Sequence, residues 1–303
     1  MALDLFAHTQ NLTEAQQYVP IATATLDFYA SHYPNRSADG RLLLWPTQVL
    51  ESYWCEWPGW TDCCENDMPQ VAAVRMLTEK LLALPEASGL LSTEQRASYT
   101  QLAGMLPLLP MTADGSQLAA AAVLSSGTHN AEVPNLFPVH PFRLLTAGRA
   151  AVDASVNLSA AIATWHALPL AQQNVGWNYG ILDAALLGLA AEAFSMAQSR
   201  ALQAPAEGYR FPAFAPHFQD YMPSADHFAN MMTAVQLMLL QSGEDAAQTL
   251  LLLPGWPCKQ DVSFKLWGAQ QTTVELVWQN SSVVSLVVMP QSRAKDVRFA
   301  ACA

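Results

Sequence analysis

The first hundred residues carry apolar side chains at helical spacing. Thr13-Glu-Ala-Gln16 is a capping sequence that precedes one apolar face, and Asp67-Met-Pro-Gln precedes a second. Ser92-Thr-Glu-Gln95 marks the start of a third helix. The first two faces consist of Ala15, Val19, Ala22, Leu26 and Tyr29, and of Val71, Val74, Leu77, Leu81 and Leu84. Further helices are predicted over 151–166, 178–201 and 225–243.

The pattern changes after the sequence Leu253-Pro-Gly-Trp-Pro257. Three segments beyond it alternate between apolar and polar residues or are continuously apolar, and they are rich in β-branched residues, as strands are. These segments cover 263–266, 272–278 and 283–288. Gln279-Asn-Ser-Ser282 separates the last two as a turn. The chain is therefore predicted to be mainly α-helical over 1–253, with a small β-rich part over 254–303.

Three long segments between the predicted helices lack a helical pattern. They cover 34–66, 107–149 and 202–224, and they are rich in Pro, Trp, Phe and His. Loops of this length in a compact domain commonly carry function. The chemistry of the protein is expected in them.

Composition and charge narrow the class of protein. The chain has 303 residues, of which 51% are hydrophobic and 13% charged, enough for one large domain or two modest ones with a sizeable core. No apolar run approaches the roughly 20 residues that a membrane helix needs. The formal net charge of −11, without any cluster of Lys or Arg, disfavours nucleic acid as a partner. A neutral substrate fits better, and neither a nucleic acid nor a membrane is expected as a partner.

The cellular compartment stays open from the sequence. The N-terminal residues have neither the basic stretch nor the apolar stretch of a signal peptide. Four Asn-x-Ser/Thr sequons nevertheless fit a secreted protein whose signal would lie upstream. They are at Asn11, Asn35, Asn157 and Asn280. Cys55, Cys63 and Cys64 match no zinc motif, and they are either buried thiols or hold a local disulfide from Cys55 to one of the other two.

In the first loop, the stretch from Leu42 to Trp54 contains one carboxylate, Glu51, among aromatic and aliphatic residues. The surrounding aromatic residues are Trp45, Trp54, Trp57 and Trp60. Aromatic faces of this kind stack on sugar rings, and apolar neighbours raise the pKa of a carboxyl group, which suits a general acid. The alternative interpretation is a solvated loop residue or a partner of an arginine.

The second loop places Glu132, His140 and Arg143 within fifteen residues, from His129 to Arg143. So many ionisable side chains in so short a segment are unusual in a chain with few charged residues. A histidine nevertheless often has only a structural role. At the end of the third loop, Asp226 precedes His227 where the next helix starts. Asp226 is therefore either a site residue or a helix N-cap.

Several types of site are disfavoured. Metal binding by the third loop would use residues without a recognised spacing, namely His217, Asp220, Asp226 and His227. No metal and no cofactor are therefore expected. The sequence contains no Gly-x-Ser-x-Gly, phosphate loop or Gly-x-Gly-x-x-Gly, so serine hydrolases, kinases and dinucleotide-binding enzymes are excluded.

Taken in order, the loop sequences resemble a known family. Phe28-Tyr-Ala-Ser-His-Tyr33 and Gly40-Arg-Leu-Leu-Leu-Trp-Pro-Thr-Gln-Val-Leu-Glu51 are similar to a segment of the six-hairpin glycosidases. Specifically, they are similar to bacterial-type relatives of glycoside hydrolase family 95, which contains α-L-fucosidases and α-L-galactosidases. The similarity extends over residues 18 to 298, and its further parts are 130–143, Gly176-Trp177, Arg210-Phe-Pro-Ala-Phe214, Asp226-His227, 239–242, 252–257 and 265–298.

The resemblance implies an (α/α)6 toroid, or its C-terminal half, followed by a β domain. It also implies inverting hydrolysis of an α-glycosidic bond, with Glu51 as the general acid. The family's Asp-Pro-x-His-Arg-His-like segment, which holds its base, has no match here, and Glu132 takes its place as the candidate base. The residues expected to line the sugar site are Trp54, Trp57, His140, Arg143, Trp177, Asp226 and His227.

Two hypotheses follow for the function. The first is an O-glycosyl hydrolase that acts on a neutral oligosaccharide or glycan. The second is an inactive carbohydrate-binding or structural remnant of such an enzyme, favoured by the missing base residues. A polysaccharide lyase on the same toroid would need to attract a uronate, which the net charge disfavours.

Overall fold

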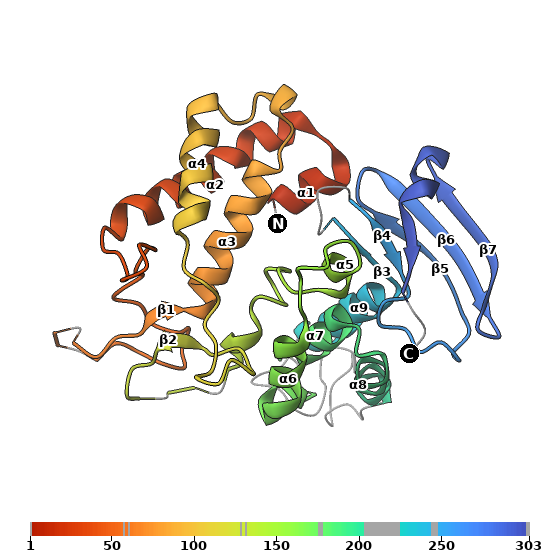
Figure 1. Cartoon of the computed structure of the whole chain (residues 1–303). Coiled ribbons are helices and arrows are strands. Elements are labelled where there is room, and N and C mark those ends of the chain that lie inside the picture. The colour runs from red at the N-terminus through yellow and green to blue at the C-terminus, as the bar shows by residue number, and fades with distance from the viewer. Residues whose placement is uncertain are drawn as a thin grey trace. The chain divides into compact units, whose positions relative to one another are not determined.

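The computed structural model describes residues 2–56, 58–59, 61–127, 129–130, 132–174, 178–202, 225–243 and 248–300. By packing, the chain divides into two compact units, Met1–Leu144 and Leu145–Ala303 (Figure 1). The predicted limit between an α-helical and a β-rich part, at 253/254, lies inside the second unit and stays a prediction.

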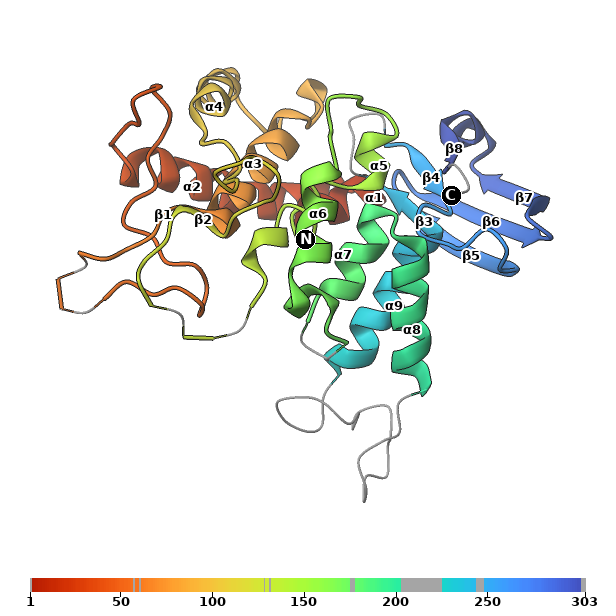
Figure 2. The same ribbon diagram turned by 60° about the horizontal axis from the view of Figure 1, so that its bottom comes forward.

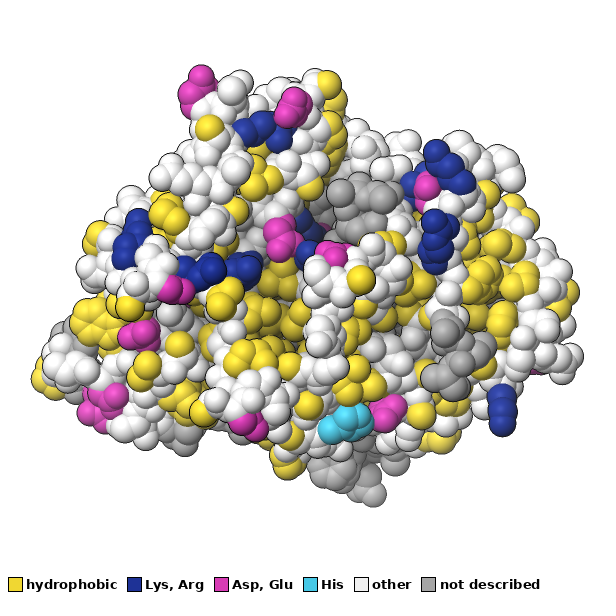
Figure 3. All heavy atoms as spheres, viewed as in Figure 1, with side chains coloured by type: hydrophobic (Ala, Val, Ile, Leu, Met, Phe, Trp, Pro, Cys, Tyr) yellow, Lys and Arg dark blue, Asp and Glu magenta, His cyan; other side chains and the backbone are white. Residues whose placement is uncertain are grey.

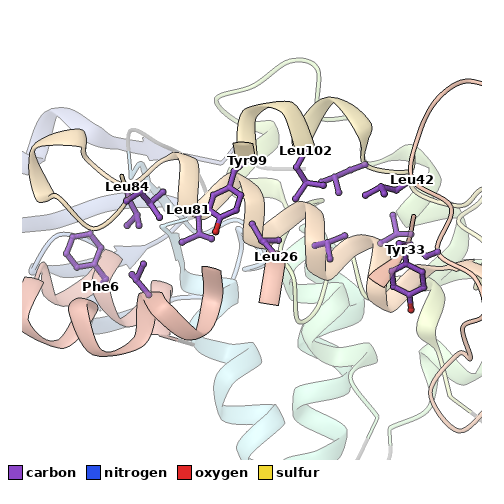
Figure 4. Close-up of a cluster of buried hydrophobic side chains, with 14 of the residues drawn as sticks. Phe6, Leu26, Tyr33, Leu42, Leu81, Leu84, Tyr99 and Leu102 are labelled. Carbon is purple, nitrogen blue, oxygen red and sulfur yellow. The ribbon is translucent and has the colours of Figure 1, made fainter. Parts of the chain in front are cut away.

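The first unit is helical, with a small two-stranded sheet. Its α-helices are α1 (Ala2–Thr9), α2 (Leu12–His32), α3 (Met68–Leu82) and α4 (Thr93–Met105). Its strands are β1 (Glu65–Asp67) and β2 (Ala121–Val123), which pair antiparallel, and its 3-10 turns are η1 (Glu86–Ser88) and η2 (Pro134–Leu136). The helices pack around a core in which Leu26 and Leu81 are fully buried and Tyr99 nearly so (Figure 4). Burial of each such side chain stabilises the fold by roughly 1.5–3 kcal/mol.

Helix starts in this unit follow local capping chemistry. Asp67 caps α3 and Ser92 forms a capping box with Gln95 at α4, as predicted. The prediction of a capping box at Thr13 is wrong: Oδ1 of Asn11 accepts the Thr13 N–H at 3.1 Å, and α2 begins at Leu12. Asn is among the strongest N-cap residues, so it takes this position ahead of a threonine two residues later.

The second unit combines helices with two sheets. Its α-helices are α5 (Ala147–Ala150), α6 (Ser159–Ala167), α7 (Gly180–Leu187), α8 (Ala190–Leu202) and α9 (Asp226–Leu239), and η3 covers Pro169–Gln172. Helices α7, α8 and α9 pack side by side (Figure 2). The single helix predicted over 178–201 is broken at Gly188, whose φ of 78° ends α7. A Cβ there would lie 3.0 Å from the carbonyl oxygen of Pro254, so both the backbone angle and the space favour glycine.

The two sheets of this unit have three strands each. In one, β4 (Leu250–Leu252) pairs antiparallel with β3 (Leu240–Ser242) and parallel with β8 (Val297–Phe299). In the other, β5 (Val262–Gly268), β6 (Thr272–Gln279) and β7 (Ser282–Met289) form an antiparallel meander, followed by η5 (Gln291–Asp296). The three predicted strands and their turn are thereby confirmed. The helix predicted over 225–243 ends earlier, at Leu239, because its last residues enter β3.

The outer strand β7 carries exposed aliphatic side chains and no charge (Figure 3). They are Val283, Val284, Leu286, Val287 and Met289. Within the described residues, no helix is both long enough and apolar enough to cross a membrane. A helical part with a β-rich C-terminal part is confirmed, while the closed ring of helices in a toroid stays a prediction.

Candidate functional site

Glu51 lies at the tip of a tight turn in the first unit. Val49 and Tyr53 form an isolated antiparallel bridge, and the Ser52 N–H donates to the Val49 carbonyl oxygen at 2.9 Å. Leu50 has a φ of 47°, in the left-handed region that residues with a Cβ seldom adopt. The turn therefore projects Glu51 outward, and its side chain is exposed. The apolar enclosure predicted for this carboxylate is not what the structure shows.

We call the turn Val49–Tyr53 the Glu51 turn. Its base is fixed to the body of the unit. Val49 is fully buried in a small cluster with Cys64, Ala120 and Ala121. Just before the turn, Thr47 exchanges two backbone hydrogen bonds with Cys64, and its hydroxyl also donates to the Cys64 carbonyl oxygen. These contacts fix the turn at its first residue, Val49, and just before it, at Thr47.

The cysteines next to the turn differ in state. Cys55 and Cys63 form a disulfide, so the interpretation as buried free thiols is wrong for these two. Cys64 is a buried free thiol, and its sulfur accepts the Ser125 N–H at 3.3 Å. The disulfide closes the short segment that follows the Glu51 turn.

The second predicted loop docks onto the Glu51 turn. One oxygen of Glu132, Oε2, accepts the Glu51 N–H and the Ser52 hydroxyl, both at 3.0 Å. The side-chain amide of Asn130 donates to Oε2 of Glu51 at 2.9 Å. The His129 N–H donates to the Ser52 carbonyl oxygen at 2.9 Å. The structure thus brings together the two carboxylates that the sequence singled out, across about eighty residues of chain.

An aromatic pair joins the same two loops. The rings of Trp54 and His129 stack with their centroids 4.4 Å apart and their planes 19° from parallel. Trp54 remains 43% exposed, which leaves part of its indole accessible to a ligand. The other predicted aromatic residues of the sugar site, Trp57 and Trp177, lie outside the described residues.

His140 and Arg143 lie in a compact series of turns after η2. The His140 N–H donates to the Leu136 carbonyl oxygen, and the Arg143 N–H donates to that of Val139. Burial, with a smaller contribution from the Arg143 charge, lowers the pKa of His140 to about 4. The imidazole is therefore neutral near pH 7, where it can exchange hydrogen bonds but does not serve as a cation.

A buried carboxyl group of the first unit, that of Asp67, was not among the predicted site residues. Asp67 is 1% exposed, and burial raises its pKa to about 6. Its Oδ1 caps α3 by accepting the Gln70 N–H at 3.0 Å, while Oε1 of Gln70 accepts the hydroxyls of Tyr29 and Tyr33. The sequence signalled only the cap, because an aspartate before Met-Pro looks the same whether it is exposed or buried.

The remaining predicted residues belong to the second unit. Asp226 is the first residue of α9 and is exposed. Ala225 holds the N-cap position and no side chain caps the helix, so the N-cap alternative for Asp226 is wrong. His227 follows in α9, and its side chain lies outside the described part. His217 and Asp220, weighed as metal ligands, also lie outside it.

Arg200, on α8, is a buried cation that the sequence did not single out. It is fully buried, and burial lowers its pKa to about 10, against an opposing effect of the Asp226 charge. Its Nε donates to the side-chain oxygen of Asn174, and its Nη2 donates to the carbonyl oxygen of Asn178 at 3.3 Å. Arg200 thus joins the two residues that flank 175–177, the segment that contains Trp177. Its place within a helical pattern gave no sign of this role.

Among the residues that the structure describes, no group of three or more His, Cys, Asp or Glu is arranged to hold a metal ion. The polar groups near Glu51 are carboxylates, amides and a hydroxyl, and they form hydrogen bonds with one another. This arrangement suits proton transfer and hydrogen bonding to a neutral ligand.

Comparison with solved structures shows structural similarity to known proteins. No protein-family model matches the chain, and no curated protein matches it. A solved structure, a rhamnosidase of glycoside hydrolase family 78 from Bacillus sp. GL1, is similar to 98% of this chain with a TM-score of 0.53 and 15% sequence identity. The similarity shows a glycosidase-like fold. The chain spans about a third of the rhamnosidase, since 32% of that chain is covered.

Proposed function

We propose that this chain hydrolyses an α-glycosidic bond, of the α-L-fucoside or α-L-galactoside class, by inversion of configuration. Glu51 is the general acid in this proposal. The observation that carries it is the convergence of two separately predicted loops on the exposed carboxyl of Glu51, with Asn130 bonded to it and the stacked Trp54 and His129 on the same two loops. The glycosidase-like fold of the rhamnosidase supports the same class of reaction.

Each part of this site has a chemical task. A carboxyl group at the tip of an exposed turn can reach a glycosidic oxygen and donate a proton to the leaving group. The exposed face of Trp54 can stack on the apolar face of a sugar ring. His140 and Arg143 are further residues of the same unit that we propose to line the sugar site. The expectation from the sequence that Trp57, Trp177, Asp226 and His227 also line it stays a prediction.

An inverting reaction also needs a group that activates water, with the two carboxyl groups roughly 6.5–9.5 Å apart. Glu132 is the candidate that the sequence offers for this group. Its two hydrogen bonds to the Glu51 turn favour a different role. This observation also favours the second candidate function, an inactive carbohydrate-binding protein that keeps the Trp54 face and lacks a base.

A panel of aryl glycosides tests the proposal. It contains α-L-fucoside, α-L-galactoside and α-L-rhamnoside together with their β anomers, and compares the wild type with Glu51→Gln. Glu56→Gln is the matched control, because Glu56 is an exposed glutamate five residues away. Loss of an acid catalyst lowers the rate by about 10²–10⁴-fold, and the control should retain wild-type turnover.

The anomeric configuration of the first product, measured by NMR, tests inversion. Isothermal calorimetry with the free sugars separates the two candidate functions. Sugar binding that is weakened by Trp54→Ala, without any turnover, would support the binding protein. Turnover that is unchanged in Glu51→Gln would exclude Glu51 as the acid.

A further inference from the structure

We propose that Glu132 is a positioning residue that fixes the Glu51 turn, and that Asn130 orients the Glu51 carboxyl. The proposal rests on the proposed function for its effect on catalysis, and on the contacts alone for its effect on the turn. It replaces the role of water-activating base that the sequence suggests for Glu132.

The contacts between the two segments are concentrated in a few residues. Glu132 holds the backbone of Glu51 and the side chain of Ser52 through one oxygen atom. Asn130 holds the carboxyl of Glu51 itself, and the backbone of His129 holds that of Ser52. Backbone and side chain of the proposed acid are therefore both bonded to the segment 129–132.

The Glu51 turn needs such support. It has Leu50 in the left-handed region, and its tip projects from the body of the unit. A carboxylate makes stronger hydrogen bonds than a neutral acceptor, so one glutamate can hold the amide and the hydroxyl at the tip together. A catalytic carboxyl on a loose turn loses rate, because small displacements of a reacting group are costly.

The same geometry disfavours the role of a base for Glu132. Oε2 of Glu132 already accepts two donors from the protein, so activation of a water molecule would fall to Oε1 alone. A water-activating carboxylate must direct an acceptor at a water molecule next to the substrate. Glu132 directs Oε2 at the acid's own backbone.

Glu132→Gln and Glu132→Ala separate the two roles in the full chain. The glutamine keeps an oxygen that can accept from Glu51 and Ser52, but it cannot act as a base. The alanine loses both properties. Hydrogen exchange at the Glu51 amide, measured by NMR, reports on the turn whether or not the protein turns over a substrate.

For a positioning residue, exchange at the Glu51 amide becomes about tenfold faster or more in Glu132→Ala and rises much less in Glu132→Gln, whose neutral oxygen still accepts. Turnover follows the same order, and added azide restores none of it. A base would behave differently: both variants would lose turnover alike while the amide stayed protected, and azide would restore the reaction in Glu132→Ala. That result would overturn the proposal.

Two further outcomes are decisive. An unprotected Glu51 amide in the wild type would overturn the proposal directly. If no glycoside is turned over but the exchange rates follow the expected order, the proposed function fails and the positioning of the turn stands. Circular dichroism of Glu132→Gln checks folding, and Glu56→Gln serves as the control for the charge that is removed.

Discussion

Asn130 donates a hydrogen bond from its side-chain amide to Oε2 of Glu51, at 2.9 Å and across 79 residues of sequence. Both residues are exposed, so water competes with this hydrogen bond and salt screens any charge placed beside it. An amide donor beside a carboxyl group restricts its orientation and leaves its second oxygen for a ligand. The bond therefore links the sequence's main candidate residue to a second loop.

Replacement of Asn130 by Asp should move the pH dependence of turnover. A second negative charge next to Glu51 favours its protonated form, which is the form a general acid needs. We expect the basic limb of the pH–rate profile to shift upward by roughly half a pH unit or more, and the shift to shrink in 1 M salt. Initial rates across pH 4–9 measure this. Asn35→Asp, the same charge change at an exposed position of the same unit, should leave the profile in place.

The cysteines next to the Glu51 turn provide a second prediction. Peptide mapping under non-reducing conditions should recover Cys55 linked to Cys63. Cys64 should resist alkylation in the native protein and react after unfolding, because it is fully buried. Recovery of Cys55 linked to Cys64 would contradict the assignment.

The features that the sequence predicted correctly are those that depend on a local pattern of residues. The helix after Asp67, the capping box at Ser92 and the hairpin around Asn280 all depend on residues a few positions apart. The break at Gly188 was missed because it also reflects the approach of the Pro254 carbonyl, which comes from a distant segment.

The candidate site was predictable only in part, for the same reason. Composition marked Glu51 and Glu132 as unusual carboxylates in aromatic loops, and the structure joins them. The sequence could not show that Glu132 directs one oxygen at the Glu51 turn, because that contact depends on how two distant loops pack together. Arg200 and Asp67 were missed because burial, and not residue type, makes them notable.

Arg200 should contribute strongly to the stability of the second unit. Arg200→Met fills much of the same volume but leaves the oxygens of Asn174 and Asn178 without its hydrogen bonds. We expect the free energy of unfolding to fall by about 2–4 kcal/mol, because each buried polar group left without a partner costs about 1–3 kcal/mol. Urea unfolding measures it. Gln198→Met, at an exposed position of the same helix, should change stability by less than about 0.5 kcal/mol.

Asp67 should make stability depend on pH. Burial raises its pKa from 3.8 to about 6, so the folded state holds a proton that the unfolded state releases near pH 4. The stabilisation is fully present below pH 4 and is lost as the pH rises through 6. The shift corresponds to about 3 kcal/mol, since one pKa unit is about 1.4 kcal/mol.

Asp67→Asn removes this titration while keeping a side chain that can cap α3. We therefore expect the variant to gain about 3 kcal/mol relative to the wild type between pH 4 and pH 8, measured by urea unfolding at both values. Any constant cost of the buried amide appears at both pH values and cancels in the comparison. An equal difference between variant and wild type at pH 4 and pH 8 would contradict this prediction. It would show that Asp67 is already ionised in the folded protein at pH 4. The N-terminus of α3 would then have to compensate for the burial of its charge.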